Sequence, residues 1–113
     1  MGTGSRTDAH LPLTDLAVHV LVAVGPGPIH GYAIGKRVEE LSGGRLRPTT
    51  GSLYQVLRRL TESELLVRVE VEEEVDGRRQ YLELTSLGRR VLKAEAARLT
   101  DLASEARAAI GVH

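Results

Sequence analysis

The stretch from residue 25 to residue 54 places the strongest constraint on the fold, because it holds two short helical patterns separated by turns of proline and glycine. It reads GPGPIHGYAIGKRVEELSGGRLRPTTGSLY. Proline lacks a backbone donor and glycine allows unusual dihedral angles, so the first turn, at 25–28, ends any preceding helix. A helix is predicted over about residues 31–41, ended by the Ser-Gly-Gly that follows it. Its inward face is expected to hold Ile34, Val38 and Leu41.

The next helix is predicted to begin at an N-cap of Thr49 or Thr50 and to extend to about Ser63. Its first turn is small and polar, which a helix needs if that turn is to enter a DNA groove. Its apolar face comprises Leu53, Val56, Leu57 and Leu60, and Tyr54, Gln55, Arg58, Arg59 and Glu62 point elsewhere.

A largely buried helix is predicted before this pair, capped by Thr14 or Asp15 and ending at about Val24. Apolar residues extend around most of it: Leu16, Ala17, Val18, Val20, Leu21, Val22, Ala23 and Val24. Residues 1–12 are expected to form a mobile tail, with His19 packed in the helix and His30 in the turn that follows.

A β-hairpin is predicted after the helices. Val67, Val69 and Val71 alternate with charged residues, which is typical of a half-buried strand. Asp76-Gly77 is a strong hairpin signal, and residues 80–84 are expected to return as the partner strand. The expected fold is mainly α with a small antiparallel β-hairpin, a winged helix-turn-helix over residues 13–84.

A long final helix is predicted from the Thr85 cap to about Ile110. Apolar residues recur along it at spacings of four and three, as in the seam of a coiled coil. Such a seam needs a partner, so the chain is expected to form a homodimer through residues 85–113. The seam residues are Leu92, Ala96, Leu99, Ala103, Ala106 and Ile110.

Composition excludes several classes of protein. The 113 residues suit one domain, and the absence of cysteine excludes disulfides and cysteine metal sites. The four histidines lack metal-ligand spacing, and Ser, His and Asp residues form no recognisable catalytic arrangement, so no cofactor, metal or enzyme activity is expected. No apolar run approaches the roughly 20 residues of a membrane span. We therefore expect a cytoplasmic protein without membrane contact.

The net charge of zero, from 15 basic and 15 acidic residues, argues mildly against nucleic-acid binding. The distribution of charge matters more than its sum. Acidic residues concentrate at 70–74, and arginines lie in the segments expected to face DNA: Arg45, Arg47, Arg58, Arg59, Arg78 and Arg79.

Four segments together resemble the PadR family of bacterial transcriptional regulators. They are GPIHGY at 27–32, PTTGSLY at 48–54, LRRL at 57–60, and RQYLELT at 79–85 with Gly88. The resemblance covers roughly residues 15–92 and implies a homodimeric winged-helix repressor of the short subfamily, dimerised through a single C-terminal helix. Two departures are Glu64, where relatives often have glycine, and Gly35, where a larger residue is usual.

The residues expected to bind double-stranded DNA lie on the helix pair and the wing. Gln55 has the donors and acceptors to read adenine, and Arg58 those to read guanine. Tyrosine hydroxyls and Lys36 suit phosphates. Arg78 and Arg79, at the tip of the predicted β-hairpin (the wing), suit the backbone or minor groove. The full set is Tyr32, Lys36, Thr49, Thr50, Gly51, Ser52, Tyr54, Gln55, Arg58, Arg78 and Arg79.

Two alternatives to a plain repressor stay open at this point. One is a sensor released from DNA by a small molecule, although the chain has no Trp or Phe to build an aromatic stacking clamp, and no effector is identified. The other is a winged helix used for protein–protein contact. Salt-dependent binding to DNA would separate this second alternative from a DNA-binding regulator.

Overall fold

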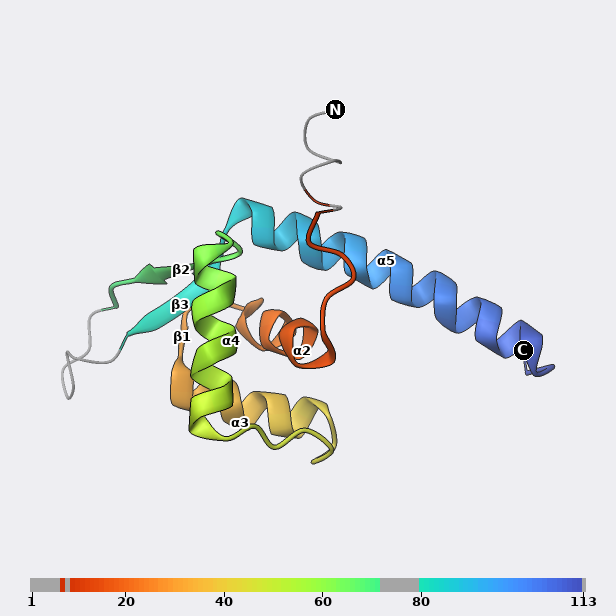
Figure 1. Cartoon of the computed structure of the whole chain (residues 1–113), viewed down its shortest axis with the longest axis horizontal. Helices are drawn as coiled ribbons and strands as arrows, with labels where there is room; N and C mark the ends of the chain where they lie inside the picture. The colour runs from red at the N-terminus through yellow and green to blue at the C-terminus, as the bar shows by residue number, and fades with distance from the viewer. Residues whose placement is uncertain (1–6, 8, 72–79, 113) are drawn as a thin grey trace.

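The computed structural model describes residues 7, 9–71 and 80–112 of the chain. Figure 1 shows the shorter helices gathered together, a small sheet at one side of them, and a long last helix that crosses above and extends far beyond. In chain order the elements are α2 (Asp15–Val24), β1 (Ile29–His30), α3 (Gly31–Leu41), α4 (Thr50–Glu62), β2 (Leu66–Val69), β3 (Tyr81–Leu84) and α5 (Ser86–Ala109).

Helix α2 lies at the centre of the core and packs against α3, α4, α5 and β3. Thr14 is its N-cap, because the Thr14 side chain accepts a hydrogen bond from the Ala17 N–H at 3.1 Å. Its buried residues are Ala17, Val20, Leu21, Ala23 and Val24. The predicted bounds and cap are confirmed, but Val22 is exposed.

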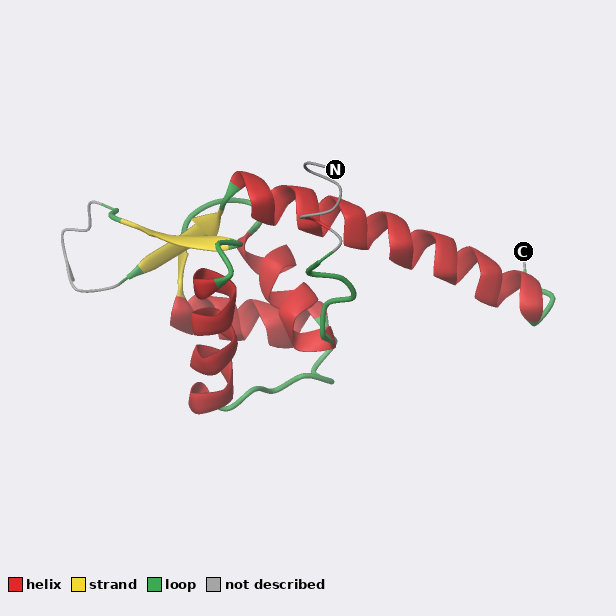
Figure 2. Ribbon diagram, turned by 45° about the horizontal axis from the view of Figure 1, so that its top comes forward, coloured by secondary structure: helices red, strands yellow, loops and turns green. Residues whose placement is uncertain are grey.

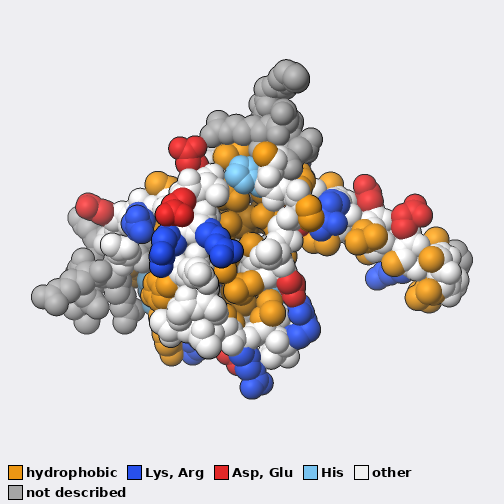
Figure 3. Space-filling model, viewed as in Figure 1, with side chains coloured by type: hydrophobic (Ala, Val, Ile, Leu, Met, Phe, Trp, Pro, Cys, Tyr) orange, Lys and Arg blue, Asp and Glu red, His pale blue; other side chains and the backbone are white. Residues whose placement is uncertain are grey.

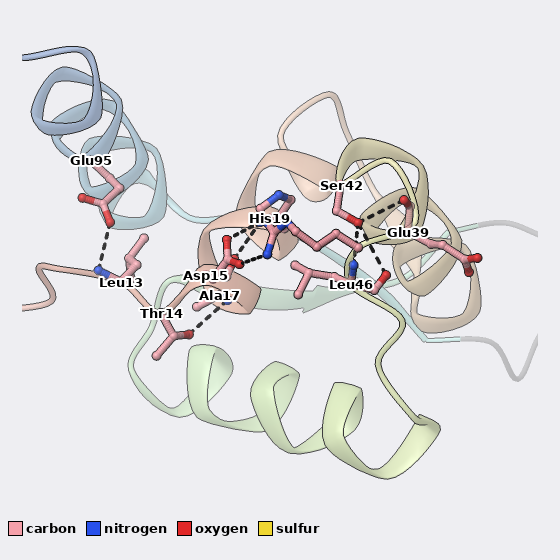
Figure 4. Close-up of polar contacts among 10 residues, drawn as sticks. Leu13, Thr14, Asp15, Ala17, His19, Glu39, Ser42, Leu46 and Glu95 are labelled. Carbon is pink, nitrogen blue, oxygen red and sulfur yellow. Dashed lines mark hydrogen bonds and ion pairs between the residues drawn. The ribbon is translucent and has the colours of Figure 1, made fainter. Parts of the chain in front are cut away.

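Helix α3 also has the predicted bounds, and its Ile34 and Val38 are fully buried. Leu41 was expected to point inward, and this is wrong: the residue is 42% exposed, because the helix ends there and the chain turns away. Ser42 then shapes the connection to α4. Its hydroxyl donates to the Glu39 carbonyl at 3.1 Å and accepts from the Leu46 N–H at 2.9 Å (Figure 4).

Helix α4 begins after Thr49, whose side chain accepts from the Ser52 N–H, and buries Leu53, Leu57 and Leu60. The turn that ends this helix is of a kind in which glycine is usual. The Leu65 N–H donates to the Leu60 carbonyl, and Glu64 has a φ of 64°. The turn that relatives often make with glycine is therefore made here with glutamate.

The sheet has three antiparallel strands in the order β1-β3-β2, rather than the predicted two. The added strand is β1, where Ile29 pairs with Leu82 and His30 with Tyr81. Residues 25–30 were predicted as a turn only. The pairing that makes β1 a strand is with residues about fifty positions later, which local sequence does not reveal.

The face assignment of β2 was also wrong. Leu66 pairs with Leu84 and is buried, whereas Val67 pairs with Glu83 and is 42% exposed. Side chains alternate along a strand, so burying Leu66 turns the next residue outward and brings Arg68 to the Leu66 side. Asp76-Gly77 lies outside the described residues.

Helix α5 begins after its predicted cap, Thr85, which accepts from the Gly88 N–H at 2.8 Å. Its first turns bury Leu87, Gly88, Val91 and Glu95. All described residues from 96 onward are exposed. Figure 2 shows that the sheet and the free end of α5 point to opposite sides of the helices. None of the helices in the described ranges has the length and apolar character needed to span a membrane.

Glu95 joins α5 to the segment that precedes α2. Only 1% of the residue is exposed, and its Oε2 atom accepts from the Leu13 N–H at 2.9 Å (Figure 4). Its Oε1 atom accepts from Arg98 Nε at 2.6 Å. Leu11 and Leu13 both pack on the core, so the last part of the segment expected to be a mobile tail lies against the domain.

Candidate DNA-binding surface

Helix α4 turns its apolar residues to the core and leaves Gln55, Arg58 and Arg59 exposed. Gln55 lies two residues before buried Leu57 and two after buried Leu53, so it projects from the opposite side of the helix. This arrangement confirms the predicted apolar face, with Val56 only half-buried. The result is one polar face along the whole helix.

The first turn of α4 is open to solvent. Thr49 and Ser52 bond to each other through their hydroxyls at 3.2 Å, and Gly51 has open space where a Cβ would stand. Within the described chain, the N–H groups of Thr50 and Gly51 have no hydrogen-bond acceptor. Free donors at the positive end of a helix favour an anion such as a phosphate.

Tyr32 and Lys36 lie one helical turn apart on α3. Tyr32 is 72% exposed, and Lys36 Nζ lies 6.0 Å from the centre of its ring, at the limit of a cation–π contact. Both side chains point away from the core, and the ammonium group is free for a further anion.

Tyr54 on α4 is 49% exposed, and its ring lies against Gly31 at the start of α3. It therefore stands between two open grooves. The α4–sheet groove has a volume of about 710 Å³ and is lined by His30, Gly31, Tyr32, Tyr54, Leu57, Arg58, Thr61, Arg68, Gln80 and Leu82. The α3–α4 groove, of about 400 Å³, is lined by Tyr32, Gly35, Lys36, Glu39, Arg47, Pro48, Thr50, Leu53 and Tyr54.

Gly35 belongs to the packing beneath this surface. A Cβ at residue 35 would approach Leu53 Cδ2 to 3.1 Å, which is tighter than ordinary contact. The absence of a side chain on α3 therefore lets α4 lie close to it, which accounts for this departure from the usual residue.

Arginine side chains gather over the C-terminal half of α4, where Figure 3 shows Lys and Arg side chains close together with Asp and Glu side chains beside them. Arg58, Arg59 and Arg68 form no ion pair with any carboxylate in the described part of the chain. Unpaired arginines of this kind are free to bind phosphate.

Two of the arginines expected near DNA are engaged elsewhere. Arg45 donates to Asp15 Oδ2 at 2.6 Å, and this hydrogen bond is the main reason that the pKa of Asp15 lies below its ordinary value. His19, expected to be packed, lies beside the same carboxylate, with its Nδ1 atom 3.2 Å from Asp15 Oδ1. Arg47 Nε lies 3.7 Å from Glu39 Oε1. Both arginines thus support the connection between α3 and α4.

The sequence did not single out Arg68 and Gln80, which the fold places in the α4–sheet groove. Arg68 Nε donates to Gln80 Oε1 at 3.2 Å across the two strands. The alternation of Val67 and Val69 with charged residues predicted only a half-buried strand, and it gave no sign that Arg68 faces α4. Arg78 and Arg79 lie outside the described residues.

The predicted seam of α5 is mostly exposed. Ala96, Leu99, Ala103 and Ala106 face solvent, and Ile110 is 75% exposed, while Leu92 packs in part against the core of its own chain. Leu102, which was not predicted for the seam, is also exposed. No group of three or more potential metal ligands occurs among the described residues.

Comparison with known proteins agrees with this architecture. The chain is 48% identical over 82 residues to an uncharacterized 37.1 kDa protein in transposon Tn4556 of Streptomyces fradiae. The match takes in 73% of this chain but spans only 22% of the relative's length.

Solved structures share the fold at lower identity. A PadR family regulator from Clostridium difficile R20291 has a TM-score of 0.73 at 20% identity, over 86% of this chain and 98% of the other. Bacillus subtilis PadR, solved in complex with operator DNA, has a TM-score of 0.62 at 20% identity, over 74% of this chain and 47% of the other. Residues 20–94 match the model of the transcriptional regulator PadR-like family, and the chain belongs to that family.

Proposed function

We propose that the chain represses transcription as a homodimer that binds a pseudo-palindromic operator in duplex DNA. The observation that carries the proposal is the polar face of α4, which joins an open first turn to a run of unpaired arginines. A helix of this kind suits the major groove, where its first residues reach base edges.

The residues around α4 suit the sugar–phosphate backbone. Tyr32 and Lys36 are exposed on α3 beside the helix, Tyr54 is exposed on α4 itself, and all three line the grooves. A tyrosine hydroxyl and an ammonium group each bind phosphate oxygens without reading sequence. We propose that these three residues set the position of α4 on the duplex, with Arg78 and Arg79 adding contacts from the wing.

Helix α5 is the proposed dimer interface. Its 24 residues extend about 36 Å, and every residue of the second half is exposed. Leu99, Leu102 and Ile110 lie exposed there, and burying them against a second copy would remove apolar surface from water. A twofold dimer presents two copies of α4, which accounts for a pseudo-palindromic operator.

Occupancy of the operator is the proposed mechanism of repression. The complex of Bacillus subtilis PadR with operator DNA supports operator binding by a protein of this fold. A regulator that acts on a bacterial chromosome works in the cytoplasm, which is where we place this protein.

Selection of binding sites from random duplexes, followed by salt titration, tests the proposal. We expect a selected site with two symmetry-related halves, and a binding constant that falls as salt rises, because bound arginines and lysines release counterions. A shuffled duplex of the same length serves as the control for sequence preference. Absence of salt-dependent binding to any duplex would favour the alternative of a winged helix used for protein contact.

A further inference from the structure

We infer that Arg68, at the base of the wing, binds a phosphate of the DNA strand that crosses the α4–sheet groove. The inference rests on the proposed function and adds a contact to it. In the register of the sheet, Arg68 of β2 pairs with Leu82 of β3. Paired residues of neighbouring strands point to the same face, and both of these residues line the groove.

The wall opposite Arg68 is formed by α4. Leu57, Arg58 and Thr61 line the groove from the helix, and Tyr54 extends this lining towards α3. The Thr61 hydroxyl donates to the Leu57 carbonyl at 2.8 Å, so it is used within the helix. The other donors of the groove include the guanidinium groups of Arg58 and Arg68 and the Tyr54 hydroxyl, groups that suit an anion with several oxygens.

The Arg68 side chain is oriented but not neutralised. Its Nε donates to the neutral amide oxygen of Gln80 at 3.2 Å, which leaves the two terminal nitrogens to other acceptors. No carboxylate among the described residues forms an ion pair with it. Glu83 pairs with Val67 and lies on the other face of the sheet. Arg45 and Arg98, in contrast, each bind a carboxylate at 2.6 Å.

The geometry of duplex DNA is expected to place a backbone phosphate in this groove. If α4 enters the major groove and the wing reaches the neighbouring minor groove, the strand that separates these two grooves passes between helix and wing. That space is the α4–sheet groove, which is open and about 710 Å³ in volume. Arg68 is the cation that the sheet contributes to it, so its ligand is a backbone phosphate and its contact carries no base preference.

The first test measures binding to duplex DNA as a function of salt for Arg68→Gln, Arg68→Lys and the control Arg90→Gln. Arg90 is an exposed arginine on α5, so the control removes the same charge away from the groove. We expect Arg68→Gln to reduce the slope of log K against log salt by about 0.9, equally for selected and random duplexes. Arg68→Lys, which keeps the charge, should preserve the slope, and so should Arg90→Gln.

The second test uses the wild-type protein and does not depend on the folding of a variant. Arginines are modified with phenylglyoxal, with and without duplex DNA, and the extent of modification at each residue is read by mass spectrometry. DNA should protect Arg68 several-fold and leave Arg90 unchanged. Equal reactivity of Arg68 in both states, or an unchanged salt slope for Arg68→Gln, overturns the inference. Failure of the wild-type protein to bind any duplex would instead overturn the proposed function.

Discussion

The ring of Tyr54 lies against the backbone of Gly31, so close that a Cβ at residue 31 would come within 2.5 Å of the Tyr54 hydroxyl oxygen. Gly31 is the first residue of α3, and Tyr54 projects from the first turns of α4. The contact fixes the direction of a half-exposed tyrosine at the junction of the two helices. It also places the hydroxyl between the two grooves that flank α4.

Gly31→Ala is therefore expected to weaken DNA binding while leaving the fold intact. The added methyl group meets the end of a side chain, which can move, and alanine is a good helix residue. Displacing Tyr54 should cost about tenfold or more in affinity, since a hydrogen bond to a charged phosphate is worth about 1.5 kcal/mol or more. Fluorescence anisotropy with labelled operator measures the loss.

A double-variant cycle with Tyr54→Ala provides the control for this prediction. If Gly31→Ala acts by moving Tyr54, the two losses should not add, because the second change finds nothing left to displace. Fully additive losses would show that Gly31 affects binding by another route.

Gly88→Ala is expected to destabilise the fold itself. A Cβ at residue 88 would overlap the carbonyl oxygen of Leu65, which is backbone and cannot move aside as a side chain can. Helix α5 would have to shift from the sheet, at a cost of about 1–3 kcal/mol or more. Urea unfolding measures the change. Gly51→Ala, which has open space, should stay within about 1 kcal/mol of the wild type.

The helices of this chain could be predicted almost to the residue because their signals are local. Thr14, Thr49 and Thr85 each precede a helix, and each accepts a hydrogen bond from an N–H of its first turn. A cap of this kind depends on three or four neighbouring residues, so the sequence alone reveals it.

The parts that the sequence did not predict depend on distant residues. Strand β1 has only two residues, and its pairing with β3 creates it. The alternation at Val67 and Val69 could not reveal which face is buried, because this depends on Leu66 reaching the core. One residue of register turns every side chain to the other face. The same error hid Arg68 as a groove residue.

Glu95 is expected to make the free energy of unfolding depend on pH in the acid range. The hydrogen bond from Arg98, and then that from the Leu13 N–H, holds the pKa of Glu95 below its ordinary value despite its burial. Its contribution is therefore fully present above the unfolded pKa of about 4.3, and it is lost as the pH falls through the lower pKa of the folded state.

Glu95→Gln should lower the free energy of unfolding at neutral pH. The difference between this variant and the wild type should shrink as the pH falls below about 4. Urea unfolding at a series of pH values measures both curves. The control is Glu105→Gln, at an exposed glutamate on the same helix, which should follow the wild type throughout. A constant difference between Glu95→Gln and wild type across this range would contradict the assignment.

Leu99→Glu is expected to convert the proposed dimer to a monomer. Leu99 lies in the exposed half of α5, and a glutamate there would place two negative charges in the seam of a twofold dimer without partners. Light scattering measures the mass. Ser104→Glu adds the same charge on a different side of the helix and should leave a dimer, whereas an unchanged dimer for Leu99→Glu would move the interface elsewhere.

Gln55 and Arg58 are expected to read bases from the polar face of α4. They lie one helical turn apart, both exposed, beyond a first turn small enough for close approach. Each good bidentate contact discriminates between bases by about 1–3 kcal/mol. Gln55→Ala or Arg58→Ala should therefore relax the base preference at one position in each half-site while the fold and the dimer persist. The two half-sites should lie about one helical turn, or a multiple of it, apart.

Selection from random duplexes with each variant measures this preference position by position. Arg68→Gln is the matched control, because a phosphate contact should weaken binding to all sequences alike and leave the selected motif unchanged. Arg58 lines the α4–sheet groove and is also proposed to contact bases, so its variant also shows which role dominates: a changed motif indicates base reading, and an unchanged motif with a lower salt slope indicates phosphate binding. If Gln55→Ala and Arg58→Ala both keep the wild-type motif, base reading lies elsewhere on the first turn, and Thr50 and Tyr54 become the residues to change next.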